Sequence, residues 1–371
     1  MAGLYDLPLK ILTMIFQILP FSAILSTCLV SRYLHAASLP FLVSSFHVEC
    51  KTLRFQRRLQ SFLETIIRNN AGQYVKSVSF DRIEEILPRE FIYLHKFLPQ
   101  LSPQLPNIRQ LAISGDFYFL SMLSDFPFQH LEELHCVESG PAIWRIIHLL
   151  PRLSLLSLRK HYCNTLQLPA TNLPIKRILL DECNLDTESL CMIIRSCKYL
   201  VSLQYHHPLS CPIFGTSIPL NSRNIHTALL IHKQSLKELI VEDCENNVAQ
   251  NETPKYGSFE DFPALNKLGV ECNALDTQLP LPPSVRSVVI RRCDSAIAPD
   301  IISYLGRHPT VELIQFNYMD GGIGRFIQHQ QDLGIIRKDI QVEPVNHDRT
   351  PSEYVYHTRR RSWQSRNISS D

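Results

Sequence analysis

Residues 153–158 read LSLLSL, which places aliphatic side chains at positions 153, 156 and 158. The last two positions lie two residues apart, so on a β-strand both side chains point to the same side of the sheet. The first position lies before the strand and reaches the same interior across the preceding turn. The stretch therefore predicts a short strand that is buried on one face.

The same pattern recurs on both sides of this stretch. Eleven copies are present, with central residues 20 to 36 positions apart: Phe46, Val78, Leu111, Leu134, Leu156, Ile178, Leu203, Leu239, Leu268, Val288 and Ile314. Most of these spacings fall in or near the range of about 20–29 residues that is typical of leucine-rich repeats, whose strands stack on a continuous core. Residues 43–345 are therefore predicted to form an irregular α/β solenoid, with parallel strands on the concave face and helices on the convex face.

Apolar residues at helical spacing between these strands predict the helices of the solenoid. They cover residues 91–98, 142–150, 189–195, 225–232, 300–305 and 325–331. Residues 51–70 predict a longer helix, with Leu59, Phe62, Leu63, Ile66 and Ile67 on one face. Residues 43–74 would thus form a strand and a helix that link the N-terminal segment to the repeats.

Residues 11–30 carry no charged side chain, and about 20 apolar residues is the length of a membrane span. Pro20 lies in the middle of the run, where it would break a helix. Asp6 and a single Lys10 precede the run, whereas a signal peptide begins with a basic cluster. These observations favour short helices over a membrane-inserted segment, and we expect no membrane partner.

Divided at Pro20, this segment carries two apolar stripes at helical spacing. The first consists of Leu7, Ile11, Ile15 and Leu19, with Leu12 and Phe16 beside it; the second consists of Ile24, Leu25, Leu29 and Val30. Three short helices cannot bury this much apolar surface among themselves. Either a partner protein covers the excess, or the helices dock on the rest of the chain.

Residues 7–42 resemble the F-box, whose pattern combines Leu-Pro, an aliphatic helix with Ile-Phe, and an aliphatic run that ends in Val, Ser or Cys, Arg or Lys, and an aromatic residue. The resemblance implies that residues 1–42 form a three-helix domain that binds the Skp adaptor of an SCF-type ubiquitin ligase and, through it, the cullin core. Lys10 stands where the pattern usually has an acidic residue. Carried over by position, the implied adaptor contacts are Leu7, Pro8, Ile11, Leu12, Ile15, Phe16, Leu19, Leu25, Leu29 and Val30.

The composition is that of a folded protein, with 45% apolar and 19% charged residues. A net charge of +2 provides no global field to attract nucleic acid, so we expect no nucleic-acid partner. The 11 cysteines include no CxxC pair and no zinc spacing, which favours reduced thiols in a cytoplasmic or nuclear protein. Cys183, Cys244 and Cys293 each follow a central repeat residue by five positions, where leucine-rich repeats use Asn or Cys to bind the turning backbone.

The sequence contains none of the common catalytic or nucleotide-binding motifs. Phosphate-binding glycine loops, HExxH and GxSxG are all absent, and we predict no catalytic residue, no cofactor and no metal site. Together with the F-box resemblance, this predicts a non-catalytic subunit of a ubiquitin ligase that recognises a protein substrate. A scaffold that joins no ligase is the alternative. Residues 346–371 lose all periodicity and predict a disordered basic tail.

The predicted substrate surface consists of strand residues between the buried positions. These residues point away from the core: Arg159, Arg177, Asp181, Glu238, Glu242, Lys267, Glu271 and Arg291. A basic group followed by a largely acidic group suggests a protein partner of mixed charge. An ordinary solvated face is the alternative for the same residues.

Overall fold

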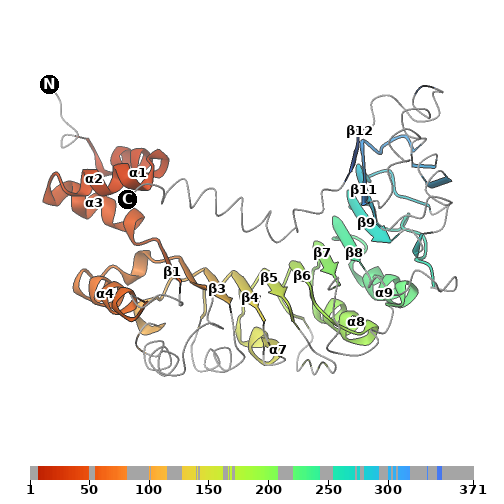
Figure 1. Cartoon of the computed structure of the whole chain (residues 1–371), viewed down its shortest axis with the longest axis horizontal. Helices are drawn as coiled ribbons and strands as arrows, with labels where there is room; N and C mark the ends of the chain where they lie inside the picture. The colour runs from red at the N-terminus through yellow and green to blue at the C-terminus, as the bar shows by residue number, and fades with distance from the viewer. Residues whose placement is uncertain are drawn as a thin grey trace. The chain divides into compact units, whose positions relative to one another are not determined.

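The computed structural model contains two compact units, and in each the strands run parallel in the order of the chain (Figure 1). The residues that the structure describes are 7–49, 55–81, 100, 102–114, 128–138, 140, 143–161, 166, 168, 172–207, 220–242, 254–271, 274–275, 280–291, 300–301, 304–305, 308–317, 332 and 341–344.

The first unit begins with three short helices and continues with four strands. The helices are α1 (Leu9–Ile18), α2 (Phe21–Cys28) and α3 (Arg32–Leu42), and α4 (Phe55–Arg68) follows the first strand. The strands are β1 (Ser45–Glu49), β2 (Ser77–Asp81), β3 (Gln110–Ser114) and β4 (Glu133–Val137). Single 3₁₀ turns lie at Gly72–Tyr74 and Ser102–Gln104. Within the described ranges, no helix has the length and apolar character needed to cross a bilayer.

The second unit contains eight further strands, with helices on one side of the sheet (Figure 1). The strands are β5 (Leu155–Arg159), β6 (Arg177–Asp181), β7 (Ser202–His206), β8 (Glu238–Glu242), β9 (Lys267–Glu271), β10 (Ser287–Arg291), β11 (Leu313–Asn317) and β12 (Gln341–Pro344). The described helices are α7 (Ile143–Ile146), α8 (Thr187–Ser196) and α9 (Ser222–Leu229), the last continued by a 3₁₀ turn at Leu230–His232.

The central residue of each repeat pairs with the central residue of the next. Leu156 lies opposite Ile178, Ile178 opposite Leu203, and Leu203 opposite Leu239. All four side chains are buried, because every second residue of each strand faces the same interior. The repeat pattern therefore sets both the position and the register of the strands.

All eleven strands predicted from the repeat pattern are confirmed. β12 was not predicted. The helices expected within 51–70, 142–150, 189–195 and 225–232 are present, and the described residues of 300–305 are helical. The helices expected at 91–98 and 325–331, and the tail at 346–371, lie outside the described residues.

Candidate protein-binding surface

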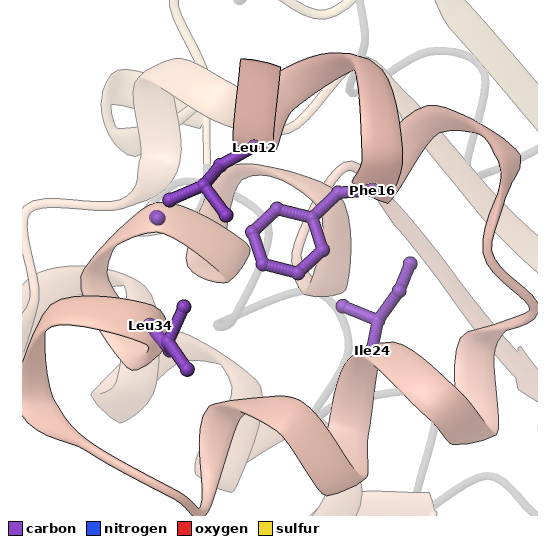
Figure 2. Close-up of a cluster of buried hydrophobic side chains, with 5 residues drawn as sticks. Leu12, Phe16, Ile24 and Leu34 are labelled. Carbon is purple, nitrogen blue, oxygen red and sulfur yellow. The ribbon is translucent and has the colours of Figure 1, made fainter. Parts of the chain in front are cut away.

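The three N-terminal helices enclose a small apolar core of their own, which Figure 2 shows between α1, α2 and α3. The phenyl rings of Phe16 and Phe41 pack with their centroids 5.7 Å apart. Leu7 and Leu19 lie at the edge of this core. Its buried members are Leu12, Phe16, Ile24, Leu34 and Ala37.

Local sequence signals determine where these helices begin and end. Pro20 separates α1 from α2, since proline has no N–H to continue the α1 hydrogen-bond pattern. The Ser31 hydroxyl caps α3 by accepting a hydrogen bond of 3.2 Å from the Leu34 N–H. The Tyr33 hydroxyl donates to the carbonyl oxygen of Leu7 at 3.2 Å, which ties the first turn of α3 to the segment before α1.

A second apolar stripe lies on the outer face of α1. Ile11, Met14 and Ile18 are spaced three and four residues apart, so they share one face of the helix, turned away from Leu12 and Phe16. Ile18 is 83% exposed and Met14 is 56% exposed. A surface helix normally has a polar outer face, so α1 is apolar on the side where water is expected.

The turn between α2 and α3 adds further exposed apolar side chains. Leu29 is 81% exposed and Val30 is 62% exposed. Among the described residues, eight of the thirteen exposed large apolar side chains fall in this short N-terminal segment. We call these eight the exposed apolar set: Leu9, Ile11, Met14, Ile18, Leu25, Leu29, Val30 and Tyr33.

The predicted adaptor contacts fall into three groups by exposure: exposed, half-buried and fully buried. Ile11, Leu25, Leu29, Val30 and Pro8 are exposed. Leu7, Ile15 and Leu19 are half-buried.

Leu12 and Phe16 need a correction, because their side chains are 0% and 2% exposed and build the core. Their side chains pack beneath the surface and are not accessible to a partner. The predicted adaptor contacts did not include four exposed residues: Leu9, Met14, Ile18 and Tyr33. The spacing of Met14 and Ile18 from Ile11 could have found two of them.

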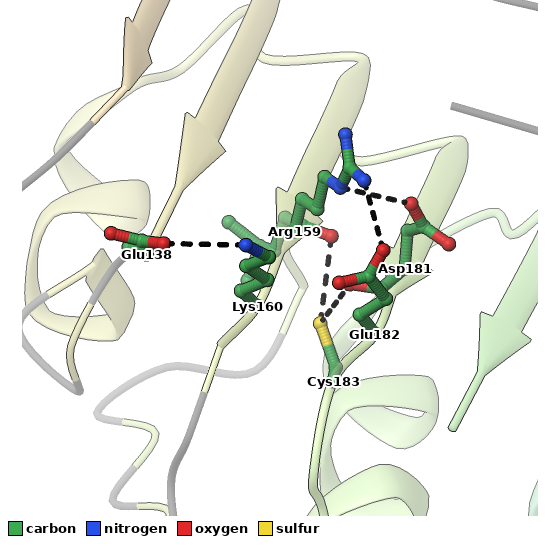
Figure 3. Close-up of polar contacts among 7 residues, drawn as sticks. Glu138, Arg159, Lys160, Asp181, Glu182 and Cys183 are labelled. Carbon is green, nitrogen blue, oxygen red and sulfur yellow. Dashed lines mark hydrogen bonds and ion pairs between the residues drawn. The ribbon is translucent and has the colours of Figure 1, made fainter. Parts of the chain in front are cut away.

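In the second unit, the predicted substrate residues at the strand ends are linked by ion pairs. Arg159 lies beside both Asp181, at 3.5 Å, and Glu182, at 2.9 Å, as Figure 3 shows. On the same edge, the Lys160 ammonium lies 3.5 Å from a carboxylate oxygen of Glu138. These contacts join neighbouring repeats through their side chains.

Three of these residues adopt a left-handed backbone conformation. Glu138, Lys160 and Glu182 have φ angles of 57°, 51° and 51°, and each directly follows a strand. The backbone N–H of Glu138 donates to the Arg159 carbonyl at 2.8 Å, and that of Lys160 donates to the Asp181 carbonyl at 2.9 Å. The left-handed residue thus extends the inter-repeat bonding past the end of the strand.

A second ionic cluster joins three later strands. The Glu242 carboxylate lies 2.8 Å from Nδ1 of His206 and also pairs with Arg291. Nearer the strand starts, the Glu238 carboxylate contacts Lys267 at 2.9 Å and accepts a hydrogen bond from Ser202 at 2.9 Å.

The environment of Glu238 favours its charged form. Burial by itself raises the pKa of Glu238, but Lys267 and the hydrogen bonds from Ser202 and Gln204 outweigh it, so the pKa lies below its usual value. The carboxylate is therefore held charged by its neighbours across the strands.

The predicted outward, solvent-facing position does not hold for three carboxylates. Asp181, Glu242 and Glu271 are buried, with at most 8% of the residue exposed. Arg177 is exposed, whereas Arg159, Glu238, Lys267 and Arg291 are half-buried. The predicted set therefore separates into three buried carboxylates and five more accessible residues.

The five cysteines among the described residues are free and buried. Cys183 donates from Sγ to the carbonyl oxygens of Leu158, at 3.5 Å, and Asp181, at 3.3 Å, which confirms the predicted backbone contact (Figure 3). Burial raises the pKa of its thiol far above the usual value, so it is unreactive. Cys244 and Cys293 lie outside the described residues. No group of His, Cys, Asp and Glu able to hold a metal ion is found in the described part of the chain.

Comparison with known proteins identifies the N-terminal segment. Residues 4–39 match the F-box domain. A comparison with curated proteins found no match. A solved structure described as "Crystal structure of Rad7 and Elc1 complex in yeast" is similar at 13% sequence identity and a TM-score of 0.45, over 82% of this chain and 70% of that chain. A similarity this low assigns neither function nor partner. The match at residues 4–39, on the three helices α1 to α3, shows that this chain carries an F-box domain at its N-terminal end.

Proposed function

We propose that this protein is the substrate-recognition subunit of an SCF-type ubiquitin ligase. In this proposal the F-box domain binds a Skp-type adaptor, which connects the chain to the cullin core, and the repeats bind a protein substrate. The observation that carries the proposal is the exposed apolar set on a domain that matches the F-box.

The exposed apolar set gives the adaptor a physical reason to bind. Burying one large aliphatic side chain contributes about 1.5–3 kcal/mol. Met14, Ile18 and Leu29 are each more than half exposed, and all three lie in one short segment. Isolated apolar side chains are common on protein surfaces, whereas a concentration of them indicates a binding site.

The proposed mechanism is tethering. A substrate held by the repeats and a ligase core held by the F-box domain are joined through one chain, which raises the local concentration of each for the other. Ubiquitin transfer then takes place on other subunits, and this chain supplies position and selectivity.

In this proposal the substrate contacts the more accessible of the predicted charged residues in the second unit. Arg177 is exposed, and the Glu238–Lys267 pair and Arg159 are half-buried. The buried Asp181 and Glu242 link strands through ion pairs, and like the buried Glu271 they offer little surface to a substrate.

The proposal is tested by binding of the full chain to a purified Skp-type adaptor. The variant Met14→Asp/Ile18→Asp places two charges on the outer face of α1, away from the core, so the domain should still fold. We expect it to lose adaptor binding by at least about a hundredfold, since two buried contacts are removed and two charges are desolvated.

The matched control is Ile231→Asp, which makes the same kind of change at a residue of the repeats that is 60% exposed. It should bind the adaptor like the wild type. Equal adaptor binding by the wild type and Met14→Asp/Ile18→Asp would refute the assigned surface. Co-purification of a cullin with the wild type, and its loss in the double variant, separates a ligase subunit from a scaffold that joins no ligase.

A further inference from the structure

The F-box domain has an unusual balance of charges. Its charged side chains are Asp6, Lys10 and Arg32, and within residues 7–44 both permanent charges, Lys10 and Arg32, are positive. Both cations are exposed, and neither forms an ion pair with any of the residues that the structure describes.

Both cations lie beside members of the exposed apolar set. Lys10 precedes Met14 by four residues on α1, so the two side chains are neighbours along one face of the helix. Arg32 opens α3, two residues after the exposed Val30. The hydrogen bond from Tyr33 to Leu7 connects the first turn of α3 to the segment that leads into α1.

Arg32 also lies at a position that disfavours a cation. It is the first residue of α3, after the Ser31 cap, where the helix dipole presents partial positive charge. A carboxylate there would stabilise the helix. The charge of Arg32 thus opposes local helix stability slightly, and no described residue compensates for it.

Resting on the proposed function, we propose that the adaptor surface that covers this domain carries carboxylates at the rim of its apolar groove, and that these pair with Lys10 and Arg32. When a partner covers Met14 and Val30, it removes water from the neighbouring cations. A charge that loses water without gaining a partner is costly, whereas a paired one is tolerated and improves selectivity.

A carboxylate on the adaptor would also explain why this chain can carry a lysine at position 10. The F-box pattern usually has an acidic residue at this position, and this chain has the opposite charge. A partner that accepts this chain therefore needs a complementary negative group at this point. An adaptor with a basic group there would be rejected by repulsion, which makes Lys10 a specificity determinant.

An anionic lipid surface is the competing occupant, since apolar side chains next to cations also bind membranes. Helices that lie on membranes are rich in Lys and Arg along their polar face. On α1, Lys10 is the one cation. The charge distribution favours a protein with a few placed carboxylates.

The test measures the dissociation constant of the full chain for a purified Skp-type adaptor at about 0.05 M and about 0.5 M NaCl, where screening differs strongly. The variants are Lys10→Glu, Arg32→Glu and Lys10→Glu/Arg32→Glu. The control is Arg57→Glu, which reverses an exposed cation in the first turn of α4, outside the F-box domain. Circular dichroism confirms that each variant is folded.

We expect the double reversal to weaken binding by about tenfold or more at low salt, and by clearly less at high salt, because the rim charges act through a screened interaction. Arg57→Glu should leave the dissociation constant unchanged. A double reversal that binds within about twofold of the wild type at low salt overturns the inference. So does sedimentation of the wild type with anionic phospholipid vesicles that depends on Lys10 and Arg32.

The two proposals fail in different ways. If the wild type and Met14→Asp/Ile18→Asp bind the adaptor equally, the proposed surface is refuted and the rim contacts fall with it. If the double apolar variant loses binding but the charge reversals do not, the proposed function stands and the carboxylate rim is refuted.

Discussion

The F-box domain and the second unit place their apolar and charged side chains in opposite ways. In the F-box domain, α1 carries apolar residues on both its inner and its outer face, and the cations Lys10 and Arg32 form no ion pair with a described residue. In the second unit, Tyr199 and Ile231 are the exposed large apolar residues among those described, and several charges form ion pairs between strands. The repeats complete their own surface, whereas the F-box domain leaves part of its surface to be covered.

This contrast predicts that truncating an apolar side chain to alanine lowers the free energy of unfolding by different amounts in the two regions. Leu203→Ala removes a fully buried central residue of β7, which pairs with Ile178 and Leu239. It should lower the free energy of unfolding of the second unit by about 2–5 kcal/mol, through lost burial and the cavity left behind. Urea unfolding followed by circular dichroism measures this change.

The matched mutation in the F-box domain is Ile18→Ala, which should change the free energy of unfolding by less than about 0.5 kcal/mol. Its side chain is 83% exposed, so little burial is lost. The contrast breaks if Ile18→Ala costs as much as Leu203→Ala, because the outer face of α1 would then be part of the chain's own core.

A smaller effect is expected from pH, and it should come from the repeats. Burial lowers the pKa of His232 below its usual value of 6.5. The ring accepts a hydrogen bond from the Leu200 N–H at Nδ1, at 3.3 Å, and its Nε2 lies 2.8 Å from the Ile194 carbonyl oxygen, so Nδ1 has no room for a proton.

The folded state therefore binds a proton less readily than the unfolded state. The stability from His232 is complete above about pH 6.5 and is lost as the pH falls from there towards the lower pKa of the folded state. Urea midpoints measured between about pH 5 and pH 8 should fall on acidification, and less steeply in His232→Gln. His35→Gln, at an exposed residue of the F-box domain, should keep the wild-type slope.

The smallest effect is expected at the left-handed residue Lys160. Glycine removes the strain of a positive φ, about 1 kcal/mol, but it loses a partly exposed ion pair with Glu138 and adds freedom to the unfolded chain. Lys160→Gly should therefore stay within about 1 kcal/mol of the wild type in urea unfolding, whereas Lys160→Val should be clearly destabilised. A large loss in Lys160→Gly would show that the Lys160 side chain holds the repeats together.

Most of the strand positions could be predicted because one short pattern encodes them. The prediction missed β12, and its sequence explains why. Around Val342, the residue three positions before is Asp339 and the residue two positions after is Pro344, so neither flanking position is aliphatic. The strand is held by pairing with β11, which places Val342 opposite Ile314.

The faces of α1 could not be assigned from the sequence. Seven of the ten residues of this helix are apolar and they spread over more than one face, so apolar character alone does not separate inside from outside. Leu12 and Phe16 turn inward because Ile24 and Leu34 meet them there, which is a tertiary contact. Likewise, the buried Asp181 and Glu242 pair with cations in other strands, Arg159 and Arg291, which a single repeat does not reveal.

The order of the strands in the second unit has a consequence for how this part of the chain forms. Among the described strands of the second unit, each from β5 to β12 pairs with its neighbours in chain order, so pairing joins segments that are close in the chain. Folding can then start at any repeat and spread to the neighbouring repeats in both directions. A destabilising mutation at one end should therefore unfold the nearest strands first and leave the distant strands folded.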